Sequence, residues 1–290
     1  MFSTLKIIIF SIMVFNAESI TNFADIDCGQ TPNERKAKII GGEHAIESEF
    51  PWLVSITRRG THFCGGTLIS NRYVMTAAHC LCTGSGNDHI SPSSIKVTIS
   101  QHDLTNKNSN AFQIGIKSLK LHPEYSCNKV KNDIAILELE KLVSWTESVS
   151  PACLPGDNYE KAYSNFHNEL ATVAGWGWTK EERGGGGRAT ILQKAKVQVI
   201  ETEKCRTWYK SQGKKTKITE SQICAGHEQG GVDACWADSG GPLMVHNDSK
   251  NQMMVVGVVS TGIGCGRPYL PGIYTRVSEF IPWIKAILEE

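Results

Sequence analysis

A serine, a histidine and an aspartate are the residues of this chain whose types and settings suggest chemistry. Ser239 lies in "DSGGP", His79 in "MTAAHC" and Asp133 in "NDIAIL". Acyl transfer by a serine hydroxyl needs a base that accepts its proton and an anion that orients the base. Each residue taken singly is more often structural, as a turn, loop or core residue. The interpretation therefore depends on whether the fold brings the three together.

The overall charge argues against nucleic acid as a partner. The 290 residues carry 30 Lys and Arg against 29 Asp and Glu, a formal net charge of +1. No basic excess is available to neutralise phosphates. A local basic run, Lys214, Lys215 and Lys217, is interpreted as a solvated loop. A chain of this length can bury a sizeable core, as one large domain or two smaller ones.

Residues 1–19 are predicted to be a secretory signal peptide. Lys6 precedes an apolar run from Ile7 to Phe15, which is shorter than the roughly 20 residues of a membrane-spanning helix. Cleavage is expected after Ser19, with cleavage after Ala17 as the alternative. No later segment is apolar enough to cross a bilayer. We therefore expect a secreted, extracellular protein without a membrane partner.

Cysteine usage fits that compartment. The ten cysteines lie at positions 28, 64, 80, 82, 127, 153, 205, 224, 235 and 265. In a secreted chain they predict five disulfides. The alternative is a metal site at Cys80-x-Cys82 beside His79, but a second close pair at ligand spacing is missing. We expect neither a metal nor a cofactor.

The pattern of apolar residues predicts an all-β protein from Ile39 onwards. Short β-branched or alternating runs are separated by Gly, Asn and Pro, as in a barrel or sandwich. These runs are Trp52–Thr57, Gly66–Ser70, Ile95–Ser100, Ile134–Glu138, Lys196–Ile200 and Met253–Ser260. Helical spacing is found at the end alone, over Val277–Leu288. The glycine-rich stretch Thr179–Arg188 is predicted to be a surface loop.

Several motifs in register identify a family. The segments are "IIGGEHAIESEFPW", "CGGTLIS", "MTAAHC", "NDIAIL", "AGWG", "DSGGPL" and "PGIYTRV". In order and spacing they resemble the trypsin-like serine proteases of the chymotrypsin family, across essentially all of residues 39–290. The resemblance implies two packed six-stranded antiparallel β-barrels, with the site in the cleft between them and a helix at the C-terminus. It also implies that His79 is the general base, Asp133 its orienting anion and Ser239 the nucleophile.

The resemblance gives the polar leader, residues 20–38, a role in activation. An activating protease that cut the Lys38–Ile39 bond would free a new amino group. In the family this amine folds inward and pairs with the aspartate before the nucleophile, here Asp238. The pair would order the loop that carries Ser239. We therefore expect a zymogen with its protease domain over residues 39–290, and self-activation remains open.

Substrate choice is predicted from one acidic residue. Asp233, six residues before Ser239, matches the base of the family's primary pocket, and Gly262 and Gly272 match its walls. A carboxylate in a narrow apolar slot prefers Arg or Lys, because an uncharged side chain would leave it unpaired. Cleavage after Arg or Lys is therefore expected.

The chain departs from the family pattern at three positions near this pocket. The segment from Ser260 to Gly262 matches the strand that pairs with the substrate backbone, but Thr261 replaces the usual tryptophan. Trp236 replaces a glutamine at the pocket rim. Ala237 replaces the glycine whose N–H, with that of Ser239, forms the oxyanion hole. A Cβ at positive φ costs about 1–2 kcal/mol, so we expect an active but restricted enzyme.

The resemblance also implies most of the disulfides. Its pairs are Cys64–Cys80, Cys205–Cys224, Cys235–Cys265 and Cys28–Cys153, the last tethering the leader. Ala171 and Val245 occupy the sites of another common bridge. Cys82 and Cys127 remain, and both lie within reach of a common point if His79 meets Asp133. A Cys82–Cys127 bridge is therefore predicted.

Weaker features complete the prediction. Asn247 begins a glycosylation sequon, and Gln101–Asn110 has too few acids for the calcium loop found in the family. The leading hypothesis is a secreted, zymogen-activated serine endopeptidase whose partners are protein or peptide substrates, an activating protease and protein protease inhibitors. The alternative is a weak or inactive homologue that acts as a binding module.

Overall fold

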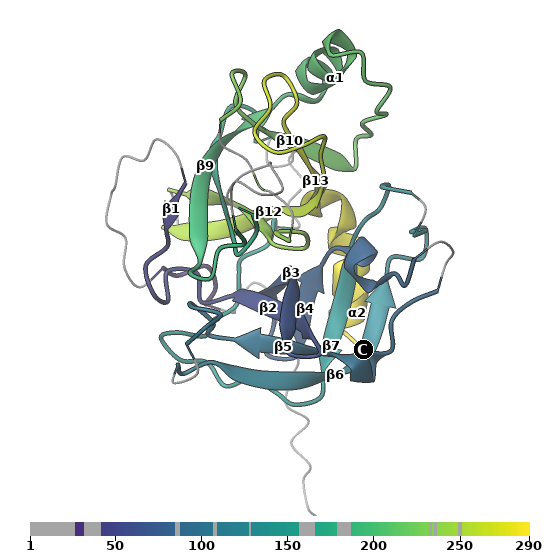
Figure 1. The fold of residues 1–290 in the computed structure, drawn as a ribbon. Helices are drawn as coiled ribbons and strands as arrows, with labels where there is room; N and C mark the ends of the chain where they lie inside the picture. The colour runs from purple at the N-terminus through teal and green to yellow at the C-terminus, as the bar shows by residue number, and fades with distance from the viewer. Residues whose placement is uncertain are drawn as a thin grey trace, which may run out of the picture.

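The computed structural model describes ten parts of the chain. These are residues 27–31, 42–84, 88–106, 109–127, 129–156, 166–178, 187–231, 234, 237–248 and 251–290. Two stacked β-barrels make up most of them, with the first half of the chain in the lower barrel of Figure 1 and the second half in the upper one. None of the helices in these parts is long and apolar enough to cross a membrane.

The first barrel closes in the order β2-β3-β4-β7-β6-β5, with all pairs antiparallel. Its strands are β2 (Leu53–Arg58), β3 (Thr61–Leu68), β4 (Tyr73–Thr76), β5 (Ile95–Ile99), β6 (Phe112–Leu121) and β7 (Ala135–Leu139). Every residue of β4 and β7 is buried, which fits their β-branched and apolar sequences.

The second barrel closes in the order β9-β10-β13-β12-β11-β8, because β8 also pairs with β9. Its strands are β8 (Leu170–Gly175), β9 (Gln193–Ile200), β10 (Gln222–Gly226), β11 (Pro242–Asn247), β12 (Gln252–Thr261) and β13 (Gly272–Arg276). The short β1 (Glu43–His44) adds to the outer edge of β9. The predicted fold of two six-stranded antiparallel barrels is confirmed.

The two barrels contact each other through buried side chains and backbone. The indole N–H of Trp52, at the start of the first barrel, points at the sulfur of Met244 in the second, 3.2 Å away. The chain then ends in the 3-10 helix η5 (Val277–Phe280) and α2 (Ile281–Leu288), which lie beside the first barrel. There His122 packs edge-on against Phe280 and Trp283. The C-terminal segment thus fastens the second barrel to the first.

The prediction that helical spacing is confined to the C-terminus is wrong. A second helix, α1 (Thr202–Ser211), lies at the far end of the second barrel (Figure 1). Cys205, Trp208 and Tyr209 form its buried face at the i, i+3, i+4 spacing of an amphipathic helix. The polar residues between them obscured this short pattern.

Candidate active site

His79 and Asp133 form the central pair of the cleft. His79 is in the 3-10 helix η2 (Ala78–Leu81), directly after β4, and Asp133 lies just before β7, the strand that pairs with β4. The Nδ1–H of His79 donates to Asp133 Oδ2 at 2.7 Å, and the backbone N–H of His79 donates to Oδ1 at 2.8 Å. The imidazole therefore keeps Nε2 as a free acceptor of protons.

The surroundings of Asp133 keep its carboxylate ionised and fixed in place. Ser260 Oγ donates a hydrogen bond to Oδ2, and Thr275 Oγ1 donates to the backbone carbonyl at 2.7 Å. Burial alone raises the pKa of Asp133, but the charge of His79 and the hydrogen bonds from His79 and Ser260 outweigh it, so the pKa is lowered.

Pairing with Asp133 raises the pKa of His79. Burial lowers the pKa of His79, while the charge of Asp133 and its hydrogen bond raise it, and the net shift is upward. About a third of the side chain, 35%, is exposed, whereas that of Asp133 is 1% exposed. One face of the His79 imidazole is therefore open to the cleft, while the carboxylate of Asp133 is buried.

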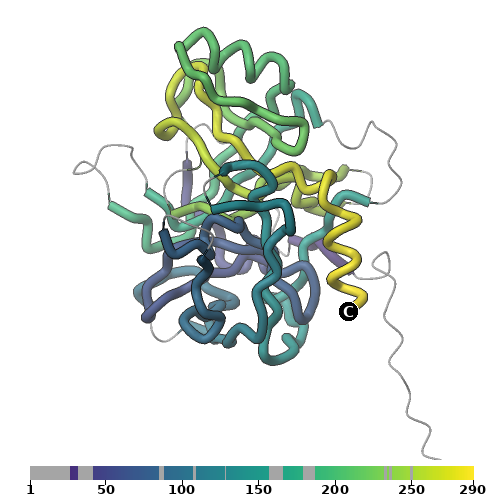
Figure 2. Tube along the Cα trace, turned by 90° about the vertical axis from the view of Figure 1, so that its right-hand side faces the viewer, coloured from purple at the N-terminus to yellow at the C-terminus, as the bar shows by residue number. Residues whose placement is uncertain are grey.

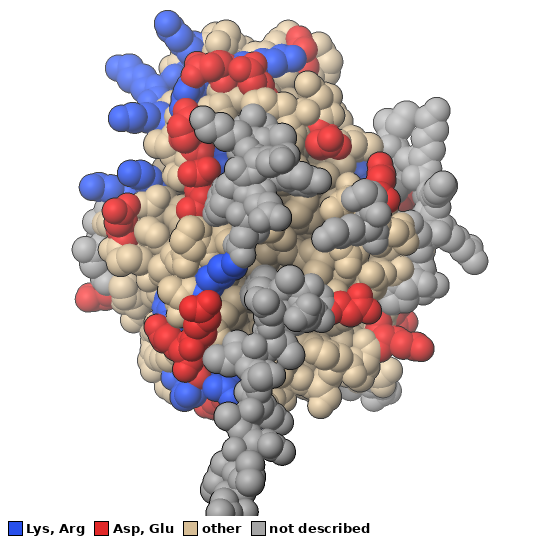
Figure 3. All heavy atoms as spheres, turned by 180° about the vertical axis from the view of Figure 1, so that it is seen from behind, with Lys and Arg blue, Asp and Glu red and all other residues tan. Residues whose placement is uncertain are grey.

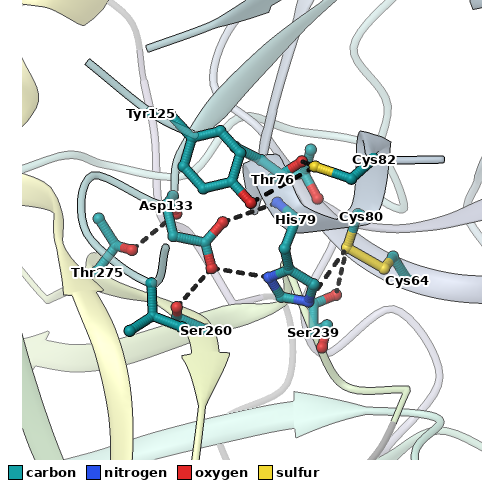
Figure 4. A network of polar contacts seen from close by, with 12 residues as sticks. Cys64, Thr76, His79, Cys80, Cys82, Tyr125, Asp133, Ser239, Ser260 and Thr275 are labelled. Carbon is teal, nitrogen blue, oxygen red and sulfur yellow. Dashed lines mark hydrogen bonds and ion pairs between the residues drawn. A yellow bond between two sulfur atoms is a disulfide. The ribbon is translucent and has the colours of Figure 1, made fainter. Parts of the chain in front are cut away.

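Ser239 lies on the side of the imidazole away from Asp133, next to the Cys64–Cys80 disulfide (Figure 4). Its backbone carbonyl accepts a hydrogen bond from the N–H of Gly65 in the first barrel at 2.8 Å. On the other side, the N–H of Gly240 donates to Val259 in the second barrel at 2.8 Å. The serine is thus held by both barrels, and the structure brings together the three residues that the sequence predicted.

Asp238 turns away from the cleft, toward the segment after β8. Its Oδ1 accepts the N–H of Gly177 at 2.8 Å. A Cβ on Gly175 would lie 2.1 Å from the same oxygen, so this approach requires glycine there. This contact helps fix the loop in front of Ser239.

Ala237 adopts the left-handed backbone conformation, with φ at 73°. This is the conformation that the sequence analysis identified as costly for a residue with a Cβ. The carbonyl of Ala237 accepts the Nε2–H of His62 at 3.2 Å, and His62 Nδ1 in turn accepts the hydroxyl of Ser55 at 2.8 Å. A buried polar chain from β2 and β3 therefore reaches the loop of the nucleophile.

A pocket of about 180 Å³ opens beside Ser239. It is lined by Ala234, Ser239, Val259, Ser260, Thr261, Gly262, Gly264, Cys265, Gly272, Ile273 and Tyr274. Both glycines that the sequence assigned to the pocket walls are among them. At Gly262 an added Cβ would lie 3.6 Å from the carbonyl of Gly264, so a side chain there would narrow the opening.

Comparison with known proteins identifies the family. The model of the trypsin family matches residues 39–284, which is most of the chain. This chain belongs to the trypsin family. It is a trypsin-like serine endopeptidase, and its substrates are proteins.

Relatives support the same trypsin-like assignment. The beta subunit of clotting factor G from Tachypleus tridentatus is 36% identical over 259 residues, covering 86% of this chain and 79% of that protein. From Drosophila melanogaster, the serine proteinase stubble is 33% identical and the serine protease filzig 35% identical. The matches cover 89% and 90% of this chain but 32% of stubble and 15% of filzig.

Four predicted disulfides of this trypsin-like chain are present. They are Cys28–Cys153, Cys64–Cys80, Cys82–Cys127 and Cys205–Cys224. Cys265 is also disulfide-bonded, and its predicted partner, Cys235, lies outside the described residues. Ala171 and Val245 face each other across β8 and β11, both buried, where the other common bridge of the family would lie.

The disulfides also remove the alternative of a metal site. Cys64, His79 and Cys80 bring their ligand atoms within 4.8 Å of one another. The two sulfurs are bonded to each other, and Cys82 is bonded to Cys127. Because metal binding needs thiolates, these cysteines are not available as ligands.

Several residues that the sequence assigned to the site lie outside the described parts of the chain. Lys38, Ile39, Asp233 and Trp236 lie outside the described residues, as do residues 1–19 and most of the leader. Most of the glycine-rich stretch, residues 179–186, also lies outside. Asn247 is the last residue of β11 and is half-buried, with Asp248 exposed after it.

Sequence reasoning missed two residues of this trypsin-like site. Tyr125 directs its hydroxyl at the sulfur of Cys82, 3.6 Å away, and burial together with the charge of Asp133 raises the pKa of that hydroxyl. His62 is the second. Its place two residues before Cys64 in "THFCGG" was the available signal, but its partner is 175 residues away.

Proposed function

We propose that this endopeptidase is a secreted zymogen, activated by cleavage of the Lys38–Ile39 bond, that hydrolyses peptide bonds after Arg or Lys. The pairing of His79 with Asp133, with Ser239 on the open side of the imidazole, carries the proposal. The position of Asp233 in the sequence supports the choice of basic substrates. Four disulfides and the disulfide-bonded Cys265 support secretion.

In the proposed reaction His79 acts first as a base and then as an acid in each of two halves, and Ser239 carries the acyl group between them. His79 Nε2 takes the hydroxyl proton of Ser239 as Oγ bonds to the substrate carbonyl carbon, and Asp133 stabilises the resulting imidazolium. The carbonyl oxygen becomes an oxyanion, stabilised by the N–H groups of Ala237 and Ser239. His79 then protonates the leaving amine. In the second half, His79 takes a proton from water as the water oxygen bonds to the acyl carbon. It then returns the proton to Ser239 Oγ as the product acid leaves.

A panel of peptide amides tests the proposal. Full-length protein cleaved after Lys38 should hydrolyse amides that end in Arg or Lys and leave those that end in Phe or Leu. The Ser239→Ala variant, activated in the same way, should lose the activity while remaining folded. Equal rates on all four amides would refute the assignment of Asp233.

A binding module without catalysis is the second candidate, because the proposed oxyanion hole contains an alanine, Ala237, at a positive φ that is costly for a residue with a Cβ. A serine-reactive phosphonate separates the two. Stoichiometric labelling of Ser239 after activation supports the enzyme. Absence of labelling in protein whose N-terminus is Ile39 would favour the binding module.

A further inference from the structure

Five lysines lie in two segments at one end of the cleft. Lys129 and Lys131 precede Asp133, and Lys214, Lys215 and Lys217 follow α1. All are exposed except Lys214, which is half-buried. Within the part of the chain that the structure describes, none of these five forms an ion pair. We call them the lysine rim.

The two segments of the lysine rim are neighbours in space. The buried side chain of Gln222, at the start of β10, donates its Nε2–H to the carbonyl of Val130 at 3.1 Å. Figures 1 and 2 both show the segment after α1 next to the loop that precedes β7. Seen from behind, lysine and arginine side chains gather along the upper left edge at the level of α1 (Figure 3).

Acidic residues close to the lysine rim are engaged elsewhere. Glu220 pairs with Arg206 at 2.7 Å, and Arg206 also pairs with Glu203. Glu124 accepts a hydrogen bond from the side-chain amide of Asn132 at 3.1 Å. With five lysines and Arg206 against these three glutamates, the rim keeps an excess of positive charge.

The lysine rim is close to the strand end that lines the pocket, because Ser260 contacts Asp133, two residues after Lys131. Ser260, at the end of β12, hydrogen-bonds to Asp133, so the strand end beside the pocket runs along the loop that carries Val130. Val130 is 48% exposed there. Thr261, the next pocket residue, makes this end of the cleft polar. An extended substrate paired with this strand end would pass toward the rim.

We propose that the lysine rim binds acidic side chains of the substrate, on residues that precede the Arg or Lys at the cut. This rests on the proposed function and names the substrate class more narrowly. Exposed charges act over about 10 Å at 0.1 M salt, which is three residues of extended chain. A cleft edge of one charge sign also raises the association rate of an oppositely charged substrate.

The activation site of the chain itself has the wrong charge for this rim. The residues before Lys38 read "NERKA", with Lys36 two and Arg35 three positions upstream. The lysine rim would repel them. We therefore expect this enzyme to cleave its own activation site more slowly than a protease without such a rim would.

Matched peptides test the lysine rim. Three peptide amides end in Gly-Arg and carry three Glu, three Gln or three Lys before the Gly. For each, kcat/KM of the activated enzyme is measured at about 0.05 M and about 1 M salt. The kcat/KM of the Glu peptide should exceed that of the Gln peptide by roughly tenfold at low salt, and the ratio of the two values should approach one at high salt. The Lys peptide should be the poorest.

Charge-removing variants locate the effect. The ratio should collapse toward one in K129Q/K131Q and in K214Q/K215Q/K217Q. The control K96Q/K141Q removes exposed lysines of the first barrel and should keep the ratio. In the zymogen, R35Q/K36Q should speed cleavage at Lys38 by added active enzyme.

The outcomes separate the two proposals. No cleavage of any Arg or Lys amide would refute the proposed function. Cleavage with equal rates on Glu and Gln peptides would refute the lysine rim alone. The lysine rim would also be refuted as a site for acidic substrates if a sulfated polysaccharide bound through these lysines while the Glu to Gln ratio of kcat/KM stayed at one.

Discussion

His62 holds the carbonyl of Ala237 in a hydrogen bond from its Nε2–H, 3.2 Å long. The residue held is an alanine at a φ of 73°. The pKa of His62 is lowered to about 4, because burial and the charge of Arg188 together outweigh the bond to Ala237, which raises it. Neutral His62 therefore has one N–H, and this bond and the acceptance from Ser55 fix which nitrogen carries it. His62 thus holds the loop of the proposed oxyanion hole in this backbone conformation.

Relief of the strain at Ala237 is the first prediction. Glycine adopts positive φ without the cost of about 1–2 kcal/mol that a Cβ brings. Ala237→Gly should therefore raise kcat on peptide amides by up to about tenfold, or tighten large protein inhibitors, with the Arg to Lys ratio unchanged. An unchanged kcat and unchanged inhibitor binding would show that the alanine carries no functional strain.

The second prediction couples His62 to Ala237. His62→Leu removes the donor, and the alanine then relaxes away from positive φ more readily than a glycine would. The loss of kcat should be about tenfold larger with Ala237 than in the Ala237→Gly background. His62→Gln, which keeps an N–H, should recover part of it. Equal losses in both backgrounds would mean that His62 supports the fold in general.

The pH profile should report the His79–Asp133 pair. The base must be neutral to accept a proton, and its pKa is raised above the ordinary value of 6.5. Activity should therefore fall as the pH drops through a pKa above 6.5. In Asp133→Asn the raising charge is gone and burial remains, so the limb should move to lower pH, with kcat reduced on the order of 10⁴. A flat kcat/KM from pH 5 to 7 would exclude His79 as the base.

The Cys82–Cys127 disulfide should stabilise the loops of the base and its anion. The two residues are 45 positions apart, and closing a loop of that length contributes about 3–4 kcal/mol by the chain-entropy estimate. C82S/C127S should lower the Tm and broaden acceptance of the residue before Arg or Lys. The control is C28S/C153S, which removes the leader tether and leaves the disulfide between the loops of His79 and Asp133 intact. Unchanged acceptance of the residue before Arg or Lys in C82S/C127S, or an equal broadening in the control, would contradict the prediction.

The leader should stay attached after activation. Cys28 is bonded to Cys153, and the next residue, Gly29, donates its N–H to the carbonyl of Pro151 at 2.9 Å and accepts the N–H of Met253 at 2.8 Å. A fragment near residues 20–38 should appear on a gel only with reductant. In Cys28→Ser it should be lost without reductant. Release of the fragment from the unaltered chain without reductant would refute the tether.

The sequence alone predicted the barrels, the three central residues and four of the disulfides that the structure contains. Alternating apolar runs and motifs in fixed order are local signals, so they can be seen without coordinates. Cys82 and Cys127 were paired because they were left over and because His79 and Asp133 were expected to meet. Helix α1 was missed although Cys205, Trp208 and Tyr209 have helical spacing, because the face is one turn long.

Contacts between distant parts of the chain were decided by the tertiary structure. His62 and Ala237 are 175 residues apart, and they meet because β3 packs against the nucleophile loop of the other barrel. Likewise, the sequence of Lys214, Lys215 and Lys217 predicts a solvated loop, and the contact between Gln222 and Val130 shows that their segment lies near Lys129 and Lys131. Local propensity determines which strands form, but packing of the two barrels determines which loops share the cleft.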